Sequence, residues 1–486
     1  METTYVTTTI PYVNARPHIG FALELVQADA LARYHRLKGG SVRFQTGTDD
    51  NALSNVLSAR AAGVPVDAFV RENSDAFRSL CGALDISADH FIRTSDATHH
   101  AAVRHFLASL RSGDTYEASY RGLYCPRCED FYLERDADGA RCPDHGTALD
   151  EVEETNQFFR LERYQGAVRD LIASRRLEIL PESREVEVLR FIDGGLRDFS
   201  ISRSAERAGG WGVPFPGHPG QVVYVWVDAL VNYLTGLGYP DPTTLDPFWT
   251  GSSRKVHVIG KNVWKFHAVY WPALLLSAGL DVPDRILAHG FLTEDGRKIS
   301  KSAGNATDPK DFVARYGADA VRYYLLAHVR PFEDTDFSVT RLEAVYRADL
   351  ANTLGNLCCR LTALCEQAGV GGVEPLGAHP APAGYHESLS GFHFDQAAAA
   401  LWNELGRLNR EVAEGRPWEV IEAGRGEVVA GKLVEWARRL LAVTHWLRPL
   451  LPSTSARIHE VLTAKEIRKC EPPFPAVGRG TLPTPE

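Results

Sequence analysis

The sequence predicts a Rossmann-type α/β domain with a parallel sheet, split by an insertion and followed by an all-α helix bundle. Three observations support this prediction. The chain begins with alternating strand and helix signals, which are typical of parallel βαβ units. A cysteine-bearing stretch of short strands and turns interrupts that pattern at about 115–220, and apolar stripes at helical spacing fill 341–469.

The first strand is predicted over residues 5–10, an apolar and β-branched run. A helix follows over residues 20–37, because apolar residues recur there at helical spacing and Gly39-Gly40 ends the pattern. A second strand is predicted over residues 41–45. This βαβ beginning places ligands at the carboxyl ends of the parallel strands.

After the insertion, buried strands are predicted over 222–227, 255–259 and 286–291, with a helix between the last two that runs through Leu276. Asp308-Pro309 starts the helical part of the chain, since proline suits the first turn of a helix. The predicted parts are the first half of the catalytic domain at 1–114, the insertion at 115–220, the second half at 221–292, a connecting segment at 293–345, a helix bundle at 346–470 and a flexible tail at 471–486.

Composition is that of an ordinary globular protein, with 44% hydrophobic and 24% charged residues. No apolar run reaches the length that spans a membrane, and the N-terminus lacks a signal-peptide pattern. We therefore expect a cytoplasmic protein. The net charge of −9 argues against a broadly basic surface for non-specific nucleic-acid binding, although it leaves room for a local basic groove.

A cluster of cysteines predicts a structural zinc site in the insertion. Cys125 and Cys128 form one closely spaced pair, and Cys142 and His145 form another. Two such pairs converge tetrahedrally on Zn²⁺ and leave no open position for catalysis. The alternative is three buried cysteines beside an unrelated histidine, which the paired spacing disfavours.

Two short motifs predict a polyphosphate site. Pro17-His18-Ile19-Gly20 opens a helix, whose first N–H groups and partial positive charge attract an anion. Lys298 and Lys301 lie three residues apart in a loop rich in serine and supply two point charges. Each motif alone is common in proteins, but both follow predicted strands of one α/β domain.

Together with further segments, these motifs resemble the methionyl-tRNA synthetases, a family of class I aminoacyl-tRNA synthetases. The resemblance runs from Thr7 to about Trp418, nearly the whole chain. The matching segments are residues 12–20, 46–49, 122–125, 196–203, 224–229, 258–261, 266–272 and the lysine loop.

The resemblance implies that L-methionine and ATP form methionyl-adenylate, and that the methionyl group then passes to the 3′ end of a tRNA. His18, Lys298 and Lys301 would stabilise the transition state, since this reaction needs positioning and charge neutralisation more than acid–base chemistry. Mg²⁺ would accompany the ATP. The implied ATP-binding residues are Asn14, His18, Gly20, Glu24, Gly260, Asn262, Lys298 and Lys301.

The resemblance also implies an apolar and aromatic cage for the thioether of methionine, which packs well against aromatic rings. Asp49 would hold the α-ammonium group of the substrate. Taken singly, these residues also suit an ordinary protein core. The implied methionine-binding residues are Ile10, Tyr12, Asp49, Trp226, Ala229, Leu230, Tyr233, Val263 and His267.

In the predicted bundle, Asn356 and Arg360 lie one helical turn apart, and Trp418 follows on a later segment. The resemblance implies that these residues read the CAU anticodon of tRNA(Met), by hydrogen bonding and by stacking on single-stranded bases. The alternative is a solvated polar pair with a tryptophan that anchors a helix start. We expect a monomer.

The chain departs from the family pattern at Phe21, at Asp50-Asn51-Ala52 and at Asn262, where the family usually has a histidine, Glu-His-Gly and an aspartate. These departures leave a second reading open: a catalytically weak paralogue that binds tRNA or nucleotide in a regulatory role. A third reading keeps adenylation but transfers the product elsewhere. The retained lysine pair and substrate pocket favour an active enzyme, and the retained anticodon residues favour tRNA as acceptor.

Overall fold

The computed structural model describes residues 2–125, 129–132, 141–142, 146–250, 254–294, 297–298, 308–374 and 379–475. The described residues form two compact units. The first, which we call the sheet unit, comprises those within 1–17, 39–79 and 88–289. The second, the helical unit, comprises those within 18–38, 80–87 and 290–486.

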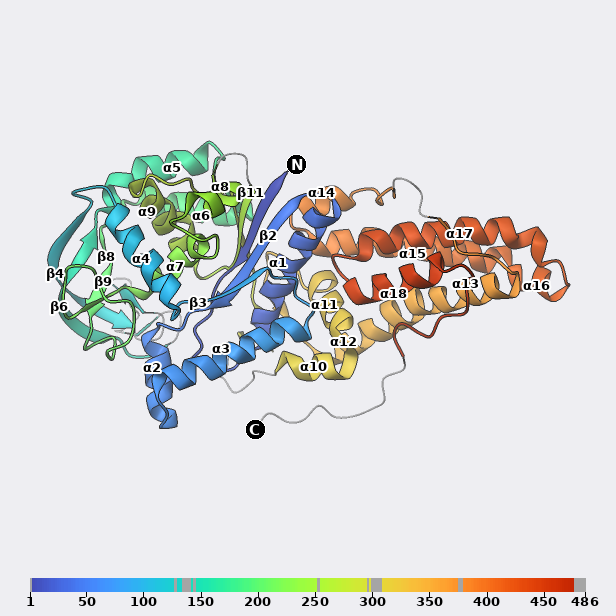
Figure 1. Ribbon diagram of the computed structural model, residues 1–486, viewed down its shortest axis with the longest axis horizontal. Coiled ribbons are helices and arrows are strands. Elements are labelled where there is room, and N and C mark those ends of the chain that lie inside the picture. Colours follow the sequence, from blue (N-terminus) through green and yellow to red (C-terminus); the bar gives the residue numbers. More distant parts are fainter. Residues whose placement is uncertain are drawn as a thin grey trace. The chain divides into compact units, whose positions relative to one another are not determined.

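The sheet unit is built on a six-stranded parallel sheet with the strand order β3-β2-β1-β11-β12-β7 (Figure 1). The strand order reverses between β1 and β11, and ligands of such folds bind outside the carboxyl ends of the strands at this switch point. The predicted parallel α/β fold class is therefore confirmed. The strands are β1 (Thr3–Thr8), β2 (Ser41–Thr48), β3 (His90–Arg93), β7 (Glu178–Leu180), β11 (Arg254–Gly260) and β12 (Arg285–His289).

Helices and loops bury the central strands, and the core of the unit is unusually aromatic. Tyr5, at the middle of β1, is fully buried, and its hydroxyl donates to the Tyr233 carbonyl at 2.9 Å. Trp249 and Trp271 are also fully buried and pack edge to face. The helices of the sheet unit are α2 (Leu53–Ala62), α3 (Val66–Ala83), whose residues from Leu80 onward belong to the helical unit, α4 (Ala97–Ser109), α5 (Gln165–Ala173), α6 (Glu182–Asp193), α7 (Val225–Thr235), α8 (Pro242–Trp249) and α9 (Trp271–Ser277).

The segment predicted as an insertion contains two kinds of structure. Its first and last parts form an antiparallel sheet with the order β5-β4-β6-β8, beside a β9–β10 pair. The part between them joins the parallel sheet, because β7 pairs with β12 and helices α5 and α6 pack on the main core. The strands are β4 (Thr115–Cys125), β5 (Asp130–Tyr132), β6 (Asp150–Phe159), β8 (Phe199–Ser200), β9 (Ser202–Ser204) and β10 (Gln221–Val223).

One predicted strand is wrong. The run 222–227 ends as a strand at Val223, and helix α7 begins at Val225. Both a buried strand and a buried helix are apolar on all sides, so the short run did not distinguish them. In the next helical segment, Val263 precedes the first helical residue, and His267 lies in a π-helical stretch, Phe266–Tyr270.

The helical unit contains helix α1 and a C-terminal bundle (Figure 1). Helix α10 begins as predicted, with Asp308 accepting from the Lys310 N–H at 2.8 Å and Pro309 in the first turn. Between α12 and α13 the chain forms a π-helix, Tyr346–Gly355. The helices are α1 (Ile19–Leu37), α10 (Pro309–Tyr316), α11 (Ala318–Ala327), α12 (Val339–Val345), α13 (Asn356–Gln367), α14 (Tyr385–Ser390), α15 (Phe394–Gly415), α16 (Pro417–Glu422), α17 (Gly426–Leu447) and α18 (Pro452–Thr463), with short strands β13 (Leu292–Glu294), β14 (Arg297–Lys298) and β15 (Thr335–Asp336).

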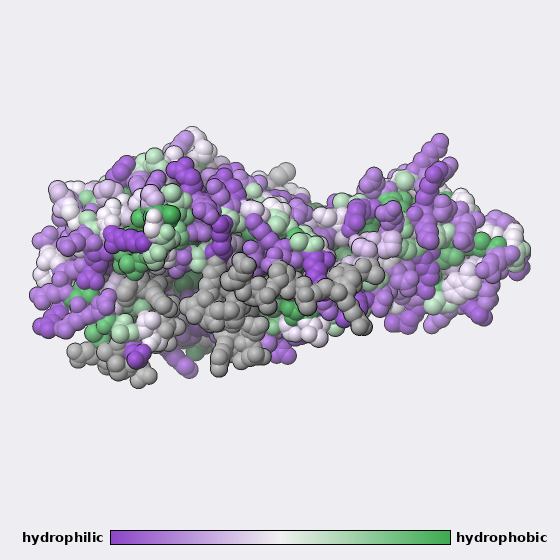
Figure 2. Space-filling view, turned by 90° about the horizontal axis from the view of Figure 1, so that it is seen from below, coloured by the Kyte–Doolittle hydropathy of each residue, from purple (hydrophilic) through white to green (hydrophobic). Residues whose placement is uncertain are grey.

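The bundle helices bury apolar stripes against one another, and the visible face of the bundle in Figure 2 is mostly hydrophilic. Leu401, Leu405 and Leu408 on α15 are fully buried, as are Leu433 and Leu440 on α17. In the described part of the chain, every helix falls short of the length and apolarity needed to cross a membrane.

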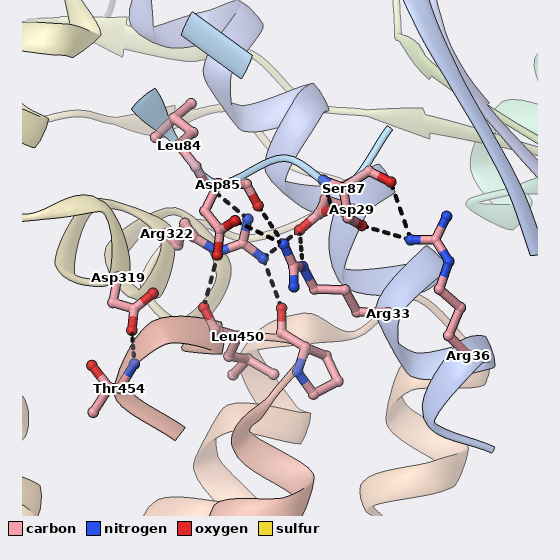
Figure 3. Close-up of polar contacts among 11 residues, drawn as sticks. Asp29, Arg33, Arg36, Leu84, Asp85, Ser87, Asp319, Arg322, Leu450 and Thr454 are labelled. Atoms are coloured by element: carbon pink, nitrogen blue, oxygen red, sulfur yellow. Dashed lines mark hydrogen bonds and ion pairs between the residues drawn. The ribbon is translucent and has the colours of Figure 1, made fainter. Parts of the chain in front are cut away.

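A buried ion pair connects four segments of the helical unit (Figure 3). Arg322 on α11 and Asp29 on α1 have fully buried side chains and lie 2.7 Å apart. Arg322 also donates to the carbonyl oxygens of Leu84, Pro449 and Leu450, at 2.9–3.2 Å. One guanidinium group therefore binds α1, the segment before β3, and the turn between α17 and α18.

The Asp29 carboxylate has further partners. Its oxygens accept from the Ser87 N–H at 2.7 Å and the Ser87 hydroxyl at 2.6 Å, and Arg33 pairs with it at 2.7 Å. Burial raises the pKa of Asp29, but Arg322, Arg33 and Ser87 outweigh burial, so its pKa lies below the ordinary value. The ion pair therefore stabilises the fold fully above the ordinary aspartate pKa, and this stability is lost as the pH falls through the lowered pKa.

We predict that Arg322→Met lowers the free energy of unfolding by about 3–5 kcal/mol, because it leaves a buried carboxylate without its main partner. Urea unfolding of the full chain measures the change. Arg33→Met is the matched control, since Arg33 binds the same carboxylate but is partly exposed. If both variants lost the same unfolding free energy, Arg322 would not be the main partner of the Asp29 carboxylate.

Candidate substrate pocket and family assignment

An aromatic cluster lies at the switch point of the parallel sheet. Tyr12 follows β1, Trp226 lies in the first turn of α7, and Phe266 belongs to the π-helical stretch after β11. Trp226 stacks on Phe266 with ring centres 3.8 Å apart, and Tyr12 lies 6.2 Å from Trp226. These rings offer an apolar, polarisable surface beyond the ends of β1 and β11. Phe266 lies within a matched segment, but the sequence did not mark it as a pocket residue.

A chain of hydrogen bonds fixes the protonation of His267. Its Nδ1 lies 2.9 Å from the Val263 carbonyl oxygen, which only accepts hydrogen bonds, so Nδ1 carries a proton. In the neutral ring, Nε2 then accepts from the Tyr233 hydroxyl, 2.8 Å away. Both side chains are almost fully buried, with 1% and 2% exposure. His257 stacks on the Tyr233 ring with centres 4.1 Å apart and holds it in place.

Asp49 is a buried carboxylate directly after β2. Its backbone N–H donates to the Pro11 carbonyl at 2.9 Å, which places Asp49 beside the exit of β1. Its Oδ1 accepts from the Asn51 N–H at 3.0 Å and the Thr94 hydroxyl at 3.2 Å. Burial, and after it the nearby Asp228, raise the pKa of Asp49 well above the ordinary value. A cationic ligand would relieve this penalty.

A second buried carboxylate, Asp228 on α7, lies behind Asp49. The Asn51 side-chain amide donates to Asp228 at 2.7 Å and to the Thr94 carbonyl oxygen at 3.0 Å. His99 contacts the other Asp228 oxygen through Nε2 at 2.8 Å. Asp228 lies in a matched segment and could have been singled out from it, whereas no motif in the sequence pointed to His99 or Thr94.

All nine residues predicted to bind methionine lie in the sheet unit. The rings of Tyr12 and Trp226 are in contact, and His267 is hydrogen-bonded both to Tyr233 and to the Val263 carbonyl oxygen. Ala229 and Leu230 are buried on α7, and Ile10 is half-buried after β1. The hydroxyl of Tyr12 is buried and has no hydrogen-bond partner among the described residues. An unsatisfied phenol at this position is suited to a polar group of a ligand.

His18 is the N-cap of helix α1. Its Nδ1 accepts from the Gly20 N–H at 3.1 Å, which leaves the proton of the neutral ring on Nε2. A side chain at position 20 would collide with the His18 ring, since its Cβ would lie 2.9 Å from Cε1. Glu24 and Phe21 are buried on the same helix.

The other predicted phosphate-binding residues are placed as follows. Asn14 is exposed in the loop after β1, Gly260 ends β11, and Asn262 is exposed just after it. Lys298 lies on strand β14, where its backbone pairs with Thr293, rather than in the predicted loop. Lys301 lies outside the described residues.

The predicted anticodon residues lie in the helical unit. Asn356 is exposed at the start of α13, and Arg360 lies one turn later on the same helix. The Arg360 guanidinium donates to the Asn409 side-chain oxygen at 2.8 Å, which holds it against α15. Trp418 is half-buried in the first turn of α16.

Half of the predicted zinc site is described. Cys125 at the end of β4 and Cys142 are buried, and they pack together with Leu149. The Cys142 N–H donates to the Thr147 carbonyl at 2.8 Å, and the Gly146 N–H to the Cys142 carbonyl at 2.7 Å, in a tight turn. Cys128 and His145 lie outside the described residues. Within the described ranges, no three metal-ligating side chains are grouped.

The parallel sheet, with a buried carboxylate and stacked aromatic rings at its switch point, defines a Rossmann-type protein. The chain belongs to the family of class I tRNA synthetases (M), whose model matches residues 4–153 and 146–362. The predicted family is thereby confirmed, and so is the prediction that the chain is a ligase that forms aminoacyl-tRNA.

Curated relatives and solved structures cover nearly the whole chain. A methionine–tRNA ligase of Thermotoga maritima is 36% identical over 480 residues, which span 95% of this chain and 75% of the relative. One of Brucella melitensis is 38% identical over 489 residues, with 95% and 92% covered. The structure of Mycobacterium tuberculosis methionyl-tRNA synthetase in complex with methionyl-adenylate is similar with a TM-score of 0.88 at 36% identity, covering 98% of this chain and 100% of that chain.

We predict that Asn51→Asp lowers the free energy of unfolding by at least about 2 kcal/mol at neutral pH. The variant replaces the amide donor of Asp228 with a further carboxylate, in a cluster that already holds the buried carboxylates of Asp49, Asp50, Glu129 and Asp228. Because buried carboxyl groups have raised pKa values, the loss should grow as the pH rises and shrink toward about pH 4. Denaturant unfolding at several pH values measures it.

Asn51→Ser is the matched control, because it removes the donor without adding charge. Its loss should be smaller and independent of pH between about 5 and 8. A loss in Asn51→Asp that is equally independent of pH would contradict the like-charge explanation.

Proposed function

We propose that this chain is a methionine–tRNA ligase: it activates L-methionine with ATP to methionyl-adenylate and transfers the methionyl group to tRNA(Met). The observation that carries the proposal is the pocket at the switch point, where a buried carboxylate lies beside an aromatic cage with a fixed Tyr233–His267 pair. The names of the relatives and the methionyl-adenylate in the similar structure support the same substrate.

In this proposal, the methionine α-ammonium group binds Asp49. The Asp49 carboxylate, which burial makes costly to charge, then gains a cationic partner, and charge pairing of this kind in a buried site is strong. The side chain lies among Ile10, Tyr12 and Trp226, and its sulfur lies near the Tyr233 hydroxyl. Since that hydroxyl donates its proton to His267, its oxygen lone pairs and ring edge face the ligand. Ala229, Leu230 and Val263 close the apolar wall.

His18 and the two lysines act on ATP. Nε2–H of His18, at the positive end of α1, donates to a phosphate oxygen, and Lys298 and Lys301 neutralise the charge that develops as the methionine carboxylate attacks the α-phosphorus. Mg²⁺ accompanies the phosphates as a further positive charge. The remaining proposed ATP contacts are Asn14, Gly20, Glu24, Gly260 and Asn262.

Further parts of the proposal concern the remainder of the molecule. Cys125, Cys128, Cys142 and His145 would hold a structural Zn²⁺. The buried pair Cys125 and Cys142, with the tight turn after Cys142, fits such a site.

The bundle at 346–470 binds the CAU anticodon through Asn356, Arg360 and Trp418. We further propose a cytoplasmic monomer with the division into parts predicted from the sequence.

Methionine-dependent exchange of labelled pyrophosphate into ATP tests the proposed activity. We expect exchange with methionine, little with leucine or homocysteine, and a loss of at least about 100-fold in Lys301→Ala, because a charged group that acts on the transition state is removed. Tyr233→Phe should raise KM for methionine about tenfold with a smaller effect on kcat, since the lost hydroxyl serves binding.

Tyr239→Phe is the matched control, because Tyr239 is also buried in the sheet unit but its hydroxyl lies beside Ser109. It should leave both constants unchanged. If the folded protein shows no exchange with methionine, the regulatory paralogue becomes the better explanation.

We predict that Trp418→Ala raises KM for tRNA in aminoacylation about 10- to 100-fold, as the loss of one base-stacking contact requires, while pyrophosphate exchange stays unchanged. Glu422→Ala, at an exposed position of the same helix, is the control and should alter neither activity. An equal decrease of both activities in Trp418→Ala would show a structural role for Trp418 instead.

A further inference from the structure

The segment that follows α18 lies along helix α13. The Cys470 N–H donates to the Thr362 hydroxyl at 3.1 Å, and the Lys469 N–H to the Glu366 carboxylate at 3.2 Å. Further along, the Pro473 carbonyl oxygen accepts from Arg457 on α18 at 3.2 Å. An isolated bridge between Gly371 and Glu466 and the buried side chains of Ile467 and Phe474 also hold the segment, which forms no helix or extended strand of its own around Cys470.

These contacts bring two cysteines together that are 111 positions apart in the sequence. The Cys470 and Cys359 sulfur atoms lie 3.7 Å apart, and both residues are partly exposed. A disulfide needs a separation of about 2.05 Å, so closure requires a movement of less than about 2 Å. Cys359 is fixed in helix α13, whereas Cys470 lies in the irregular segment, which can supply this movement.

A cavity gives access to Cys470. Its volume is about 480 Å³, within the range of small-molecule sites, and Cys470 lines it. Three basic side chains and three carboxylates line it: Arg457, Arg468 and Lys469, and Glu460, Glu466 and Glu471. Side chains of both signs suit a small peptide that carries carboxylate and ammonium groups.

We propose that Cys359 and Cys470 form a reversible intramolecular disulfide by exchange with a small peptide disulfide, such as oxidised glutathione, that enters this cavity. The Cys470 thiolate attacks the peptide disulfide, forms a mixed disulfide and releases one peptide thiolate. The Cys359 thiolate then attacks the Cys470 sulfur and releases the second. Two protein thiols are oxidised, one peptide disulfide is reduced to two thiols, and the two protons pass to the released thiolates.

The surroundings of the two thiols set this order of attack. Burial, and after it the neighbouring Cys470, raise the pKa of Cys359 to about 11, so Cys359 is mostly a thiol, and its minor thiolate form makes only the second attack, on the adjacent Cys470 sulfur. Cys470 lines the cavity and meets the incoming disulfide first. The product would fasten the segment after α18 covalently to α13, in addition to the hydrogen bonds described above. This inference does not depend on the proposed function.

The test incubates the full, reduced chain with oxidised glutathione, blocks remaining thiols and maps disulfide-linked peptides by mass spectrometry. We expect a peptide that joins Cys359 to Cys470 and a higher unfolding temperature of the oxidised chain, because the bond closes a long loop. Dithiothreitol should reverse both. Absence of this linked peptide, or a bond from Cys470 to the neighbouring Cys358, would overturn the proposal.

Single variants test the order of attack. Cys359→Ser should stop at a glutathione adduct on Cys470, and Cys470→Ser should yield neither adduct nor linked peptide. Cys365→Ala, on the same helix but outside the cavity lining, is the matched control and should still close the bond. An adduct on Cys359 that forms as fast in Cys470→Ser would contradict the assignment of Cys470 as the attacking thiol.

Discussion

The helical unit depends on one buried cation. The described partners of Arg322 are three backbone carbonyl oxygens and the Asp29 carboxylate. These partners belong to segments that are distant in sequence. Burying a guanidinium is costly unless every N–H is satisfied, so the position of each partner is strongly constrained. Helix α1 is one of these partners, and its first residues present His18. The orientation of the proposed phosphate-binding end of α1 is therefore coupled to the packing of α11 and the α17–α18 turn.

At the proposed methionine site, a buried carboxyl group has a raised pKa, in contrast to Asp29. In the helical unit, each carboxylate oxygen of Asp29 has a donor, and its pKa falls. Near Asp49, burial and the like charge of Asp228 raise the pKa of the Asp49 carboxyl. Charging Asp49 is therefore unfavourable in this environment, and an ammonium group of a ligand would offset that cost. Such an arrangement favours binding of the substrate at the expense of the stability of the free protein.

Much of the fold followed from local pattern. Some signals act within a few residues, so the sequence alone located their elements. These signals are the glycines that end α1, Asp308-Pro309 at the start of α10 and the β-branched run in β1. The run 222–227 was misassigned because its residues are buried on all sides, and burial depends on partners far away in sequence. For the same reason His99 and Thr94 could not be found. They matter only because the fold brings α4 and the end of β3 beside Asp228, and no motif encodes that proximity.

Two residues that depart from the family pattern, Asn51 and Phe21, fit their surroundings in the structure. Asn51 stands where a histidine is usual, yet its amide satisfies both Asp228 and the Thr94 carbonyl, and its N–H supports Asp49. Phe21 is 8% exposed and contributes apolar surface to α1. At both positions the substituted residue is integrated into its surroundings, and the Asn51 contacts preserve the carboxylate that the pocket needs. A protein that had lost its substrate would have no reason to keep this cluster of buried carboxylates, since replacing them with apolar residues would remove their desolvation cost. The retained charge is thus the strongest physical argument for an enzyme that still binds an amino acid.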